Sequence, residues 1–167
     1  MKFWIPTIGL IVLAGLILLS MRRGWLRRAV RTATVVGELP EAPASLGTAR
    51  TAPFDATYIG TTVAGQWLER IAGQGLGARA AGTVQLFDSG VVVVRQGIAD
   101  VYIPLDQLDA VRFDRGIAGK VADPRRLVVL TWRLKVAVDS GVLLRHPEQA
   151  QELVTALEAA VQQKEAG

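Results

Sequence analysis

The chain begins with an apolar run whose length predicts a membrane-spanning helix. The stretch FWIPTIGLIVLAGLILLSM, residues 3–21, contains no charged residue. A helix needs about 20 apolar residues to cross a bilayer, and Pro6 falls in the first turn, where its missing N–H is tolerated. We expect a transmembrane helix over 3–21, preceded by a short extension of residues 1–2.

A basic segment, RRGWLRRAVR, follows the apolar run, and we place it at residues 22–34. Positive residues beside a span stay on the cytoplasmic side and attract anionic headgroups, each by about 1 kcal/mol. We therefore expect a single pass through the plasma (inner) membrane, with the N-terminus outside and the C-terminal domain in the cytoplasm. The predicted membrane-interface residues are Trp4, Arg22, Arg23, Trp25, Arg27, Arg28 and Arg31.

Other interpretations of this region fit less well. A cleaved signal peptide has a shorter apolar core and small residues at its cleavage site, whereas this run ends in arginines. A buried core helix would not be uncharged on every face and then end in such a block. The net charge of +4 comes from residues 1–31, and the remainder of the chain is negative. We therefore predict no nucleic-acid partner.

Residues 35–53 are rich in alanine, proline and threonine, and the stretch ELPEAPAS cannot continue a helix through its prolines. This composition predicts a flexible or extended linker, which would let the domain stand away from the bilayer.

From residue 54 the pattern changes to short apolar strands separated by turn signals. Alternation is visible in TVQLFD and DAVRFD, and the triplet DSG predicts a turn. Such a series is typical of a small antiparallel barrel or sandwich. We predict a mainly β domain over 54–167 with about seven strands at 56–63, 80–87, 90–97, 99–105, 108–114, 125–134 and 135–145.

The last segment has a helical period. Pro147 suits the first helical position after a cap residue, His146, and an acidic residue follows in the first turn. Apolar residues recur three and four apart at Ala150, Leu153, Val154, Leu157 and Val161. We predict an amphipathic C-terminal helix that caps one end of the barrel. A second, short helix is predicted over 65–77.

Composition excludes several kinds of chemistry. The chain has no cysteine and one histidine, which rules out disulfides, thiolate metal sites and most histidine-based catalysis. The loop RGIAGK, residues 115–120, lacks the glycine spacing and the hydroxyl residue of a phosphate-binding loop. Carboxylates are scattered singly through turns, without an acid–base pair that spacing could justify. We predict no catalytic residue, no metal site, no cofactor and no enzymatic activity.

Some residues remain as candidates for contact with a partner or ligand. Trp67 and Trp132 are first interpreted as core aromatics, although an exposed tryptophan would suit a binding hot spot. Basic residues flank two glycine-rich loops and could meet an anionic group, but acids lie nearby. The candidate contact residues are Trp67, Arg70, Arg79, Arg115, Lys120, Arg125 and Arg126.

The stretches YIGTTVAGQWLERIAGQGLGARAAGTVQLFDSGVVVVRQG, VYIPLDQL, GIAGKV and LVVLTWRL resemble small actinobacterial membrane proteins with a bacterial pleckstrin-homology-like (PH-like) domain. The resemblance covers residues 57–161, and the chain departs from the pattern at Lys135, where glycine is usual. It implies a seven-strand barrel with a C-terminal helix and no established activity. Members of the group are often encoded among pyrimidine-biosynthesis genes.

The sequence thus predicts a membrane-anchored, non-enzymatic interaction module that binds a protein or peptide at the inner leaflet. Two alternatives stay open. One is a domain that binds anionic lipid or senses the membrane. The other is an accessory subunit of a transporter or of a membrane-associated complex, such as one of pyrimidine metabolism. Fold alone does not decide between them.

Overall fold

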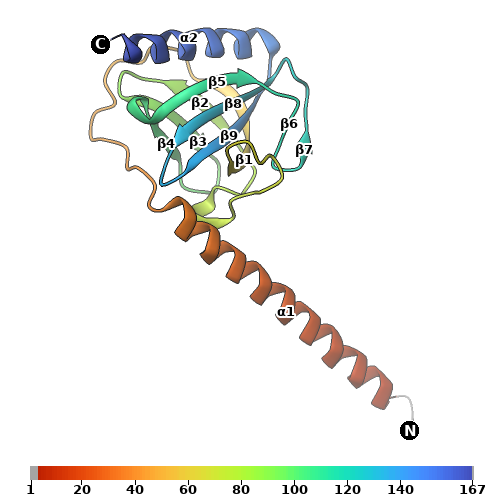
Figure 1. The fold of residues 1–167 in the computed structure, drawn as a ribbon. Coiled ribbons are helices and arrows are strands. Elements are labelled where there is room, and N and C mark those ends of the chain that lie inside the picture. Colours follow the sequence, from red (N-terminus) through yellow and green to blue (C-terminus); the bar gives the residue numbers. More distant parts are fainter. Residues whose placement is uncertain (1–3, 167) are drawn as a thin grey trace.

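In the computed structural model we describe residues 4–166, and their side chains except those of residues 4–6, 25–33, 35 and 165. One long helix projects from a small β domain, and a second helix lies across the opposite end of that domain (Figure 1). The N-terminal end of the long helix is therefore far from the domain, and the C-terminus lies on it.

The long helix α1 runs without interruption from Trp4 to Val36. It contains a window, Thr7–Gly24, that is apolar enough to cross a membrane and is not buried by the rest of the chain. The predicted boundaries at 21/22 and 34/35 do not correspond to breaks, because the basic segment is helical as well. The helix ends at Gly37, whose φ of +77° suits a glycine that terminates a helix.

The domain is a curled antiparallel sheet in the order β4-β3-β2-β1-β9-β8-β5. Its strands are β1 (Phe54–Val63), β2 (Ala80–Leu86), β3 (Gly90–Arg95), β4 (Val101–Pro104), β5 (Leu108–Phe113), β8 (Leu127–Arg133) and β9 (Ala137–Leu144). The pairing of β1 with β9 joins the two meanders into one barrel-like sheet. The predicted mainly β fold of about seven antiparallel strands with a C-terminal helix is confirmed.

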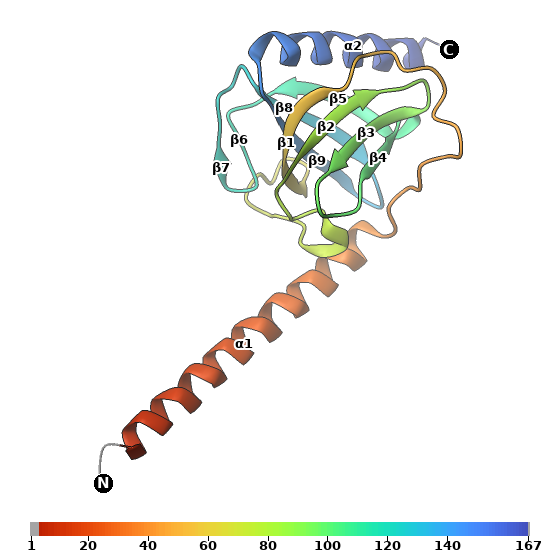
Figure 2. The same ribbon diagram turned by 180° about the vertical axis from the view of Figure 1, so that it is seen from behind.

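Helix α2 (Pro147–Glu165) closes one end of the barrel (Figure 2). The predicted apolar stripe packs against the core, with Ala150, Leu153, Val154 and Leu157 buried and Val161 partly buried. His146 is the N-cap residue and Pro147 occupies the first turn, as predicted. Burial of this stripe adds tertiary packing to a segment that is already rich in strong helix formers.

A buried polar network crosses the inside of the barrel. The Trp132 Nε1–H donates to Ser140 Oγ at 2.9 Å, and Ser140 shares a hydrogen bond of 2.6 Å with Thr61. The Tyr58 hydroxyl lies 2.6 Å from Thr61 Oγ1 and donates to the Leu76 carbonyl at 3.0 Å. Trp132 is fully buried, so its interpretation as a core aromatic is confirmed.

A two-stranded hairpin, β6 (Gly116–Ile117) and β7 (Lys120–Val121), covers the outer face of the sheet. Its turn residues Ala118 and Gly119 both have positive φ, which is the geometry of a type I′ hairpin turn. Ile117 anchors the hairpin over Gly141 of β9, where an added Cβ would come within 2.5 Å of the isoleucine side chain. The loop RGIAGK is thus an ordered hairpin.

The predicted short helix over 65–77 is wrong. The segment folds back along the end of β1: the Ile71 N–H donates to the Thr61 carbonyl and the Thr61 N–H to the Leu76 carbonyl, both at 2.9 Å. Only η1 (Gly73–Gly75) forms a single 3₁₀ turn. Long-range pairing, with Ile71 and Leu76 buried, outweighs the local helical pattern.

The predicted linker over 35–53 is extended and not flexible, because hydrogen bonds fasten much of this segment to the barrel. The Arg50 N–H donates to the Leu86 carbonyl at 2.9 Å, and the Arg50 guanidinium pairs with Asp88 at 2.8 Å. The Thr48 N–H donates to the same Asp88 carboxylate at 2.8 Å. The proline-rich segment is therefore extended and bound to the barrel, and we name residues 37–53 the strap.

Candidate functional site

The end of α1 is fixed to the barrel at a joint formed by Val36–Leu39, Gln74 and Lys135. Val36 is fully buried and belongs to the main core, and its carbonyl accepts the Lys135 N–H at 3.3 Å. The Gln74 Oε1 accepts the Leu39 N–H at 3.1 Å, and its Nε2 donates to the Gly37 carbonyl. Gln74 holds this position with a φ of +54°, which is uncommon for a residue with a side chain.

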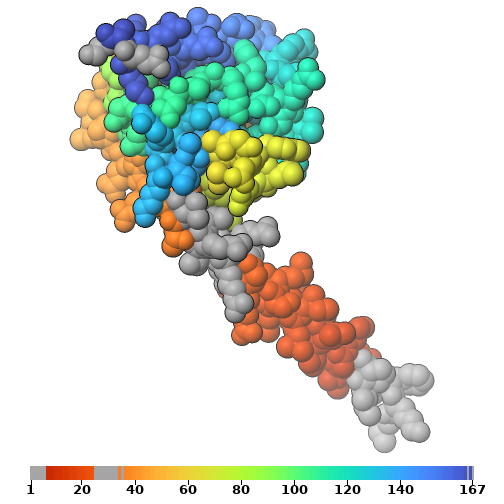
Figure 3. Space-filling view, viewed as in Figure 1, coloured from red at the N-terminus to blue at the C-terminus, as the bar shows by residue number. Residues whose placement is uncertain are grey.

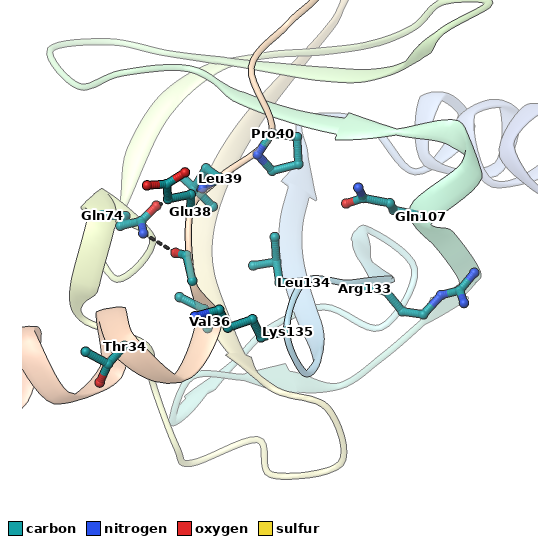
Figure 4. Close-up of a pocket in the computed structure, with 11 residues that line it drawn as sticks. Thr34, Val36, Glu38, Leu39, Pro40, Gln74, Gln107, Arg133, Leu134 and Lys135 are labelled. Atoms are coloured by element: carbon teal, nitrogen blue, oxygen red, sulfur yellow. Dashed lines mark hydrogen bonds between the residues drawn. The ribbon is translucent and has the colours of Figure 1, made fainter.

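A cleft of about 890 Å³ opens beside this joint, and we name it the joint cleft (Figure 4). Residues 36–40 form one wall, and the turn between β8 and β9, with Leu134 and Lys135, forms another. Gln107, at the end of η2 (Leu105–Gln107), and Arg133 line the remaining side. This volume lies within the range of about 300–1,000 Å³ that is usual for ligand pockets.

One polar atom in the joint cleft lacks a partner. Gln107 points toward the cleft in Figure 4, and its Oε1 is buried without a hydrogen-bond partner among the described residues. A buried acceptor of this kind costs about 1–3 kcal/mol when it stays unsatisfied. Arg133 is already engaged, with a 3.0 Å ion pair to Asp109. The cleft therefore combines apolar residues with polar and charged ones, and the Gln107 acceptor lies just beneath its surface.

A second surface, the Trp67 face, consists of Trp67, Leu68, Val121, Arg115 and Lys120. The three apolar side chains are 50%, 68% and 84% exposed, and the two basic ones are exposed as well. The β6–β7 hairpin meets the loop after β1 here, because the Gly119 N–H donates to the Trp67 carbonyl at 3.1 Å. The core interpretation of Trp67 is wrong: its indole lies at the surface.

An ion pair forms the floor of a pocket of about 430 Å³ beside Trp67. The Arg112 guanidinium donates to both carboxylate oxygens of Asp139, at 2.9 and 3.3 Å, and Thr131 Oγ1 donates to the same carboxylate at 2.6 Å. Burial alone would raise the pKa of Asp139, but the hydrogen bonds and charge of Arg112 lower it overall. The hydrogen bond to Asp139 in turn raises the pKa of Arg112.

The structure brings some of the predicted contact residues together and separates others. Trp67, Arg115 and Lys120 share one face, and Arg79 lines a small pocket beside Lys120. Arg70 instead ties the loop to the hairpin, donating to the Gly77 carbonyl at 3.1 Å and to the Ala118 carbonyl at 3.0 Å.

Arg125 and Arg126 do not contribute to the Trp67 face. Arg125 is exposed and pairs with Asp123 at 3.4 Å. The Arg126 Nε–H donates to the Leu144 carbonyl at 2.8 Å. The Arg126 side chain lines a different pocket, together with Asp55 and Arg145.

Of the predicted membrane-interface residues, Arg22 and Arg23 are exposed on α1. The side chains of Trp4, Trp25, Arg27, Arg28 and Arg31 lie outside the described residues.

Sequence reasoning did not identify Gln74, Gln107, Leu68 or Val121. A left-handed backbone at a glutamine and an unpaired amide oxygen leave no sequence signal, and exposed aliphatic residues in loops resemble core residues. Within the described part of the chain, no group of three or more histidine, cysteine, aspartate or glutamate residues could hold a metal ion.

Comparison with solved structures agrees with this architecture. A complex of PDZ-RhoGEF DH/PH domains with GTP-γ-S-activated RhoA matches with a TM-score of 0.50 and 11% identity, over 84% of this chain and 38% of that chain. Vav1 with an allosteric inhibitor matches with a TM-score of 0.44 and 13% identity, over 85% of this chain and 34% of that chain. This chain thus spans about a third of each matched chain, and at such identities the likeness concerns the fold alone.

No curated protein matches the chain. A family model described as bacterial PH domain-like, however, matches residues 36–158, which is well over half of the chain. The match extends from the last residue of α1, through the strap and all strands of the barrel, into α2. The chain belongs to the bacterial PH domain-like family.

Proposed function

We propose that the protein is a membrane-anchored, non-enzymatic PH-like module that binds an extended segment of a partner protein in the joint cleft. The window Thr7–Gly24 of α1 supplies the anchor. The arginines that follow it favour a cytoplasmic location for the domain at the inner leaflet. The observation that carries the proposal is the joint cleft, with its mixed apolar and polar lining and the unpartnered Gln107 Oε1 beneath it.

The chemistry of the cleft favours a peptide over a compact ligand. The strap continues beyond the cleft wall at Pro40, and Glu41, Ala42 and Ala44 are exposed. Their backbone groups form no hydrogen bond within residues 4–166. Extended peptides bind by adding backbone hydrogen bonds to such a free edge. A rotation of the Gln107 amide toward the cleft would let its buried oxygen accept a peptide N–H, while Leu134 would contact an apolar side chain of the peptide.

A membrane tether makes such binding effective at low affinity, because it raises the local concentration of the module near partners in the same membrane. A partner that is itself a transporter or a membrane-associated enzyme complex would make this protein its accessory subunit. The second candidate function, contact with anionic lipid, is favoured by the exposed tryptophan and basic residues of the Trp67 face.

Site-specific photo-crosslinking tests the proposal in the full-length protein in its own membranes. A photoreactive benzoylphenylalanine replaces Leu134 in the cleft or, as a matched control, Ala159 on the exposed face of α2. We expect crosslinks from position 134 only, mapping by mass spectrometry to one segment of one partner. Gln107→Ala should reduce their yield while the domain stays folded.

Two results would overturn the proposal. The first is the same set of crosslinked proteins from positions 134 and 159, which would indicate random collision. The second is no protein crosslinked at position 134 when the folded protein is abundant in its membrane, which would leave lipids and small ligands as the target.

A further inference from the structure

We infer that the Trp67 face is a second membrane contact, through which the domain rests on the bilayer that α1 crosses. The inference depends on the anchoring in the proposed function but not on the partner in the joint cleft. It assigns the headgroup region of a lipid surface as the environment of Trp67, Leu68 and Val121.

The first reason is the composition of the face. Single exposed hydrophobic residues are ordinary, but three that come together from the loop after β1 and from β7 form an apolar patch, and such patches mark contact surfaces. Trp67 suits the interface of a bilayer, where an indole ring can sit among headgroups while its N–H stays hydrated. Leu68 and Val121 are too exposed to contribute to the core of the domain.

The second reason is charge. Arg115 and Lys120 form no ion pair within the described residues, and Arg79 is exposed beside Lys120. The acids of the adjoining pocket are already satisfied: Asp139 binds Arg112, and Asp114 accepts the Arg115 backbone N–H at 2.7 Å.

Glu69 is the exposed acid on this loop, and Arg79, Arg115 and Lys120 outnumber it. Basic residues that flank an apolar patch can extend toward headgroup phosphates while their stems stay in apolar contact. The face is therefore complementary to an anionic lipid surface, although residues 32–167 as a whole are negative.

The third reason is the direction of α1. Figures 1 and 2 show from opposite sides that α1 leaves the domain at the end opposite α2 and slants beneath the side where the β6–β7 hairpin lies. In Figure 3 the segment around residues 60–70 (yellow) protrudes on this same side. The joint fixes this direction, because Val36 is buried and Gln74 holds Gly37 and Leu39.

The length of α1 between its apolar window and the domain is short enough for the Trp67 face to reach the headgroups. Residues 25–36 continue α1 beyond the apolar window and span about 18 Å at about 1.5 Å per residue. The headgroup layer occupies about 5–8 Å of this length on one side of the bilayer. Because α1 slants beneath the side of the domain that carries the β6–β7 hairpin, a tilt of about 20° toward that side, a usual angle for spanning helices, brings the Trp67 face closer to the headgroups.

The bilayer is favoured over a protein as the occupant of this face because it is always within reach of a domain held by α1. A partner protein or a second copy would have to enter the narrow space between the Trp67 face and the headgroups. The experiment therefore uses purified protein and lipid alone, at a low ratio of protein to lipid.

The test exploits the absence of cysteine from the chain. Single-cysteine variants of the full-length protein, each labelled with an environment-sensitive fluorophore, are reconstituted in vesicles of phosphatidylcholine and phosphatidylglycerol. Leu68→Cys reports on the Trp67 face, Ala159→Cys on the far end of the domain and Leu16→Cys on the span. Lipids that carry a quencher in the headgroup or in the acyl chain measure the depth of each label.

We expect the label at position 68 to show blue-shifted emission and several-fold stronger headgroup quenching than the label at 159, which should behave as in water. Acyl-chain quenching at position 16 reports the anchor independently. Trp67→Ser in the Leu68→Cys background should weaken quenching at 68 without changing it at 16.

Each outcome discriminates between the proposals. Quenching at 16 with a water-like label at 68 overturns the membrane contact and leaves the anchor intact. No quenching at 16 overturns both. Quenching at 68 that persists at high salt and in phosphatidylcholine alone assigns the contact to Trp67, Leu68 and Val121 and removes the role of the basic residues.

Discussion

Asp139→Asn is predicted to loosen the floor beneath Trp67. The Asp139 carboxylate accepts hydrogen bonds from Arg112, from Thr131 and, at 3.3 Å, from the Gly65 N–H at the start of the Trp67 loop. An asparagine replaces one of these acceptor oxygens by an NH₂ group. That group faces donors whichever way the amide is turned, so at least one hydrogen bond is lost.

The expected loss in the free energy of unfolding depends on how exposed Asp139 and Arg112 are. Removing one member of a fully buried ion pair costs about 3–5 kcal/mol, whereas exposed pairs contribute about 0.2–1 kcal/mol. The Asp139 side chain is 7% exposed, but that of Arg112 is 42% exposed and can regain water. We therefore expect the free energy of unfolding to fall by about 2 kcal/mol, between these limits.

The effect of Asp139→Asn should depend on pH. Because the pKa of Asp139 is lowered in the folded protein, its contribution to stability is fully present above the ordinary value of 3.8. That contribution is lost as the pH falls through the lower, folded pKa. The difference in stability between the wild type and Asp139→Asn should therefore be constant near neutral pH and shrink below pH 3.8.

Urea denaturation of the full chain in detergent micelles, followed by tryptophan fluorescence, measures these quantities. Arg112→Met and the double variant complete a cycle whose coupling energy should exceed about 1 kcal/mol, since the two groups are in direct contact. Asp55→Asn serves as a control, because Asp55 is exposed and lies 3.6 Å from Arg145. A loss at Asp139 no larger than this control, or one independent of pH, would refute the reasoning.

The other predictions concern packing and the joint. Gly141→Ala should destabilise the domain by about 1–3 kcal/mol in the same denaturation assay, because the new methyl group overlaps Ile117; unchanged stability would show that the hairpin moves freely. Gln74→Ala should speed hydrogen exchange at the Leu39 amide, and Gln74→Gly should be more stable than Gln74→Ala by about 1 kcal/mol, since glycine removes the left-handed strain. Equal stability of the two would contradict this. Trp132→Phe should lower the free energy of unfolding by about 1–2 kcal/mol through loss of its bond to Ser140, and near-UV circular dichroism checks that the core stays ordered.

Much of the fold could be predicted because local pattern and tertiary structure agree. The strands alternate with a period of two, and the stripe from Ala150 to Val161 has the period of a helix. Each pattern buries its apolar side against the same core, as Val84 and Leu86 do on β2. Where local preference and burial agree in this way, the sequence alone predicts the element type.

The failures occur where long-range pairing decides the structure. Trp67, Leu68 and Ile71 have a spacing compatible with one helical face, yet only Ile71 is buried. The backbone of this segment pairs with β1 and bends at its glycines, so the side chains at 67 and 68 point outward. A single sequence does not reveal which strand a glycine-rich loop will pair with.

The joint explains why the sequence pattern alone does not reveal where the anchor ends and the domain begins. Helix propensity continues through the arginines, and the apolar pattern does not change at Val36, although this residue is buried in the domain core. The family match begins at this same residue. The strap that follows is fastened to the barrel and lies within the matched region, so it belongs to the domain and not to a separate tether.

The joint also makes the two proposed contacts depend on each other. Gln74 lines the joint cleft, and the same side chain sets the direction of α1 through Gly37 and Leu39. A peptide that competes with Leu39 for Gln74 would release α1, and the Trp67 face would lose its fixed position over the bilayer. By linkage, the membrane contact would then weaken peptide binding by the same factor. A peptide that leaves Gln74 bound to Leu39 would instead bind the wild type and Trp67→Ser equally well. Measuring peptide affinity in Trp67→Ser therefore shows whether or not the peptide displaces Leu39 from Gln74.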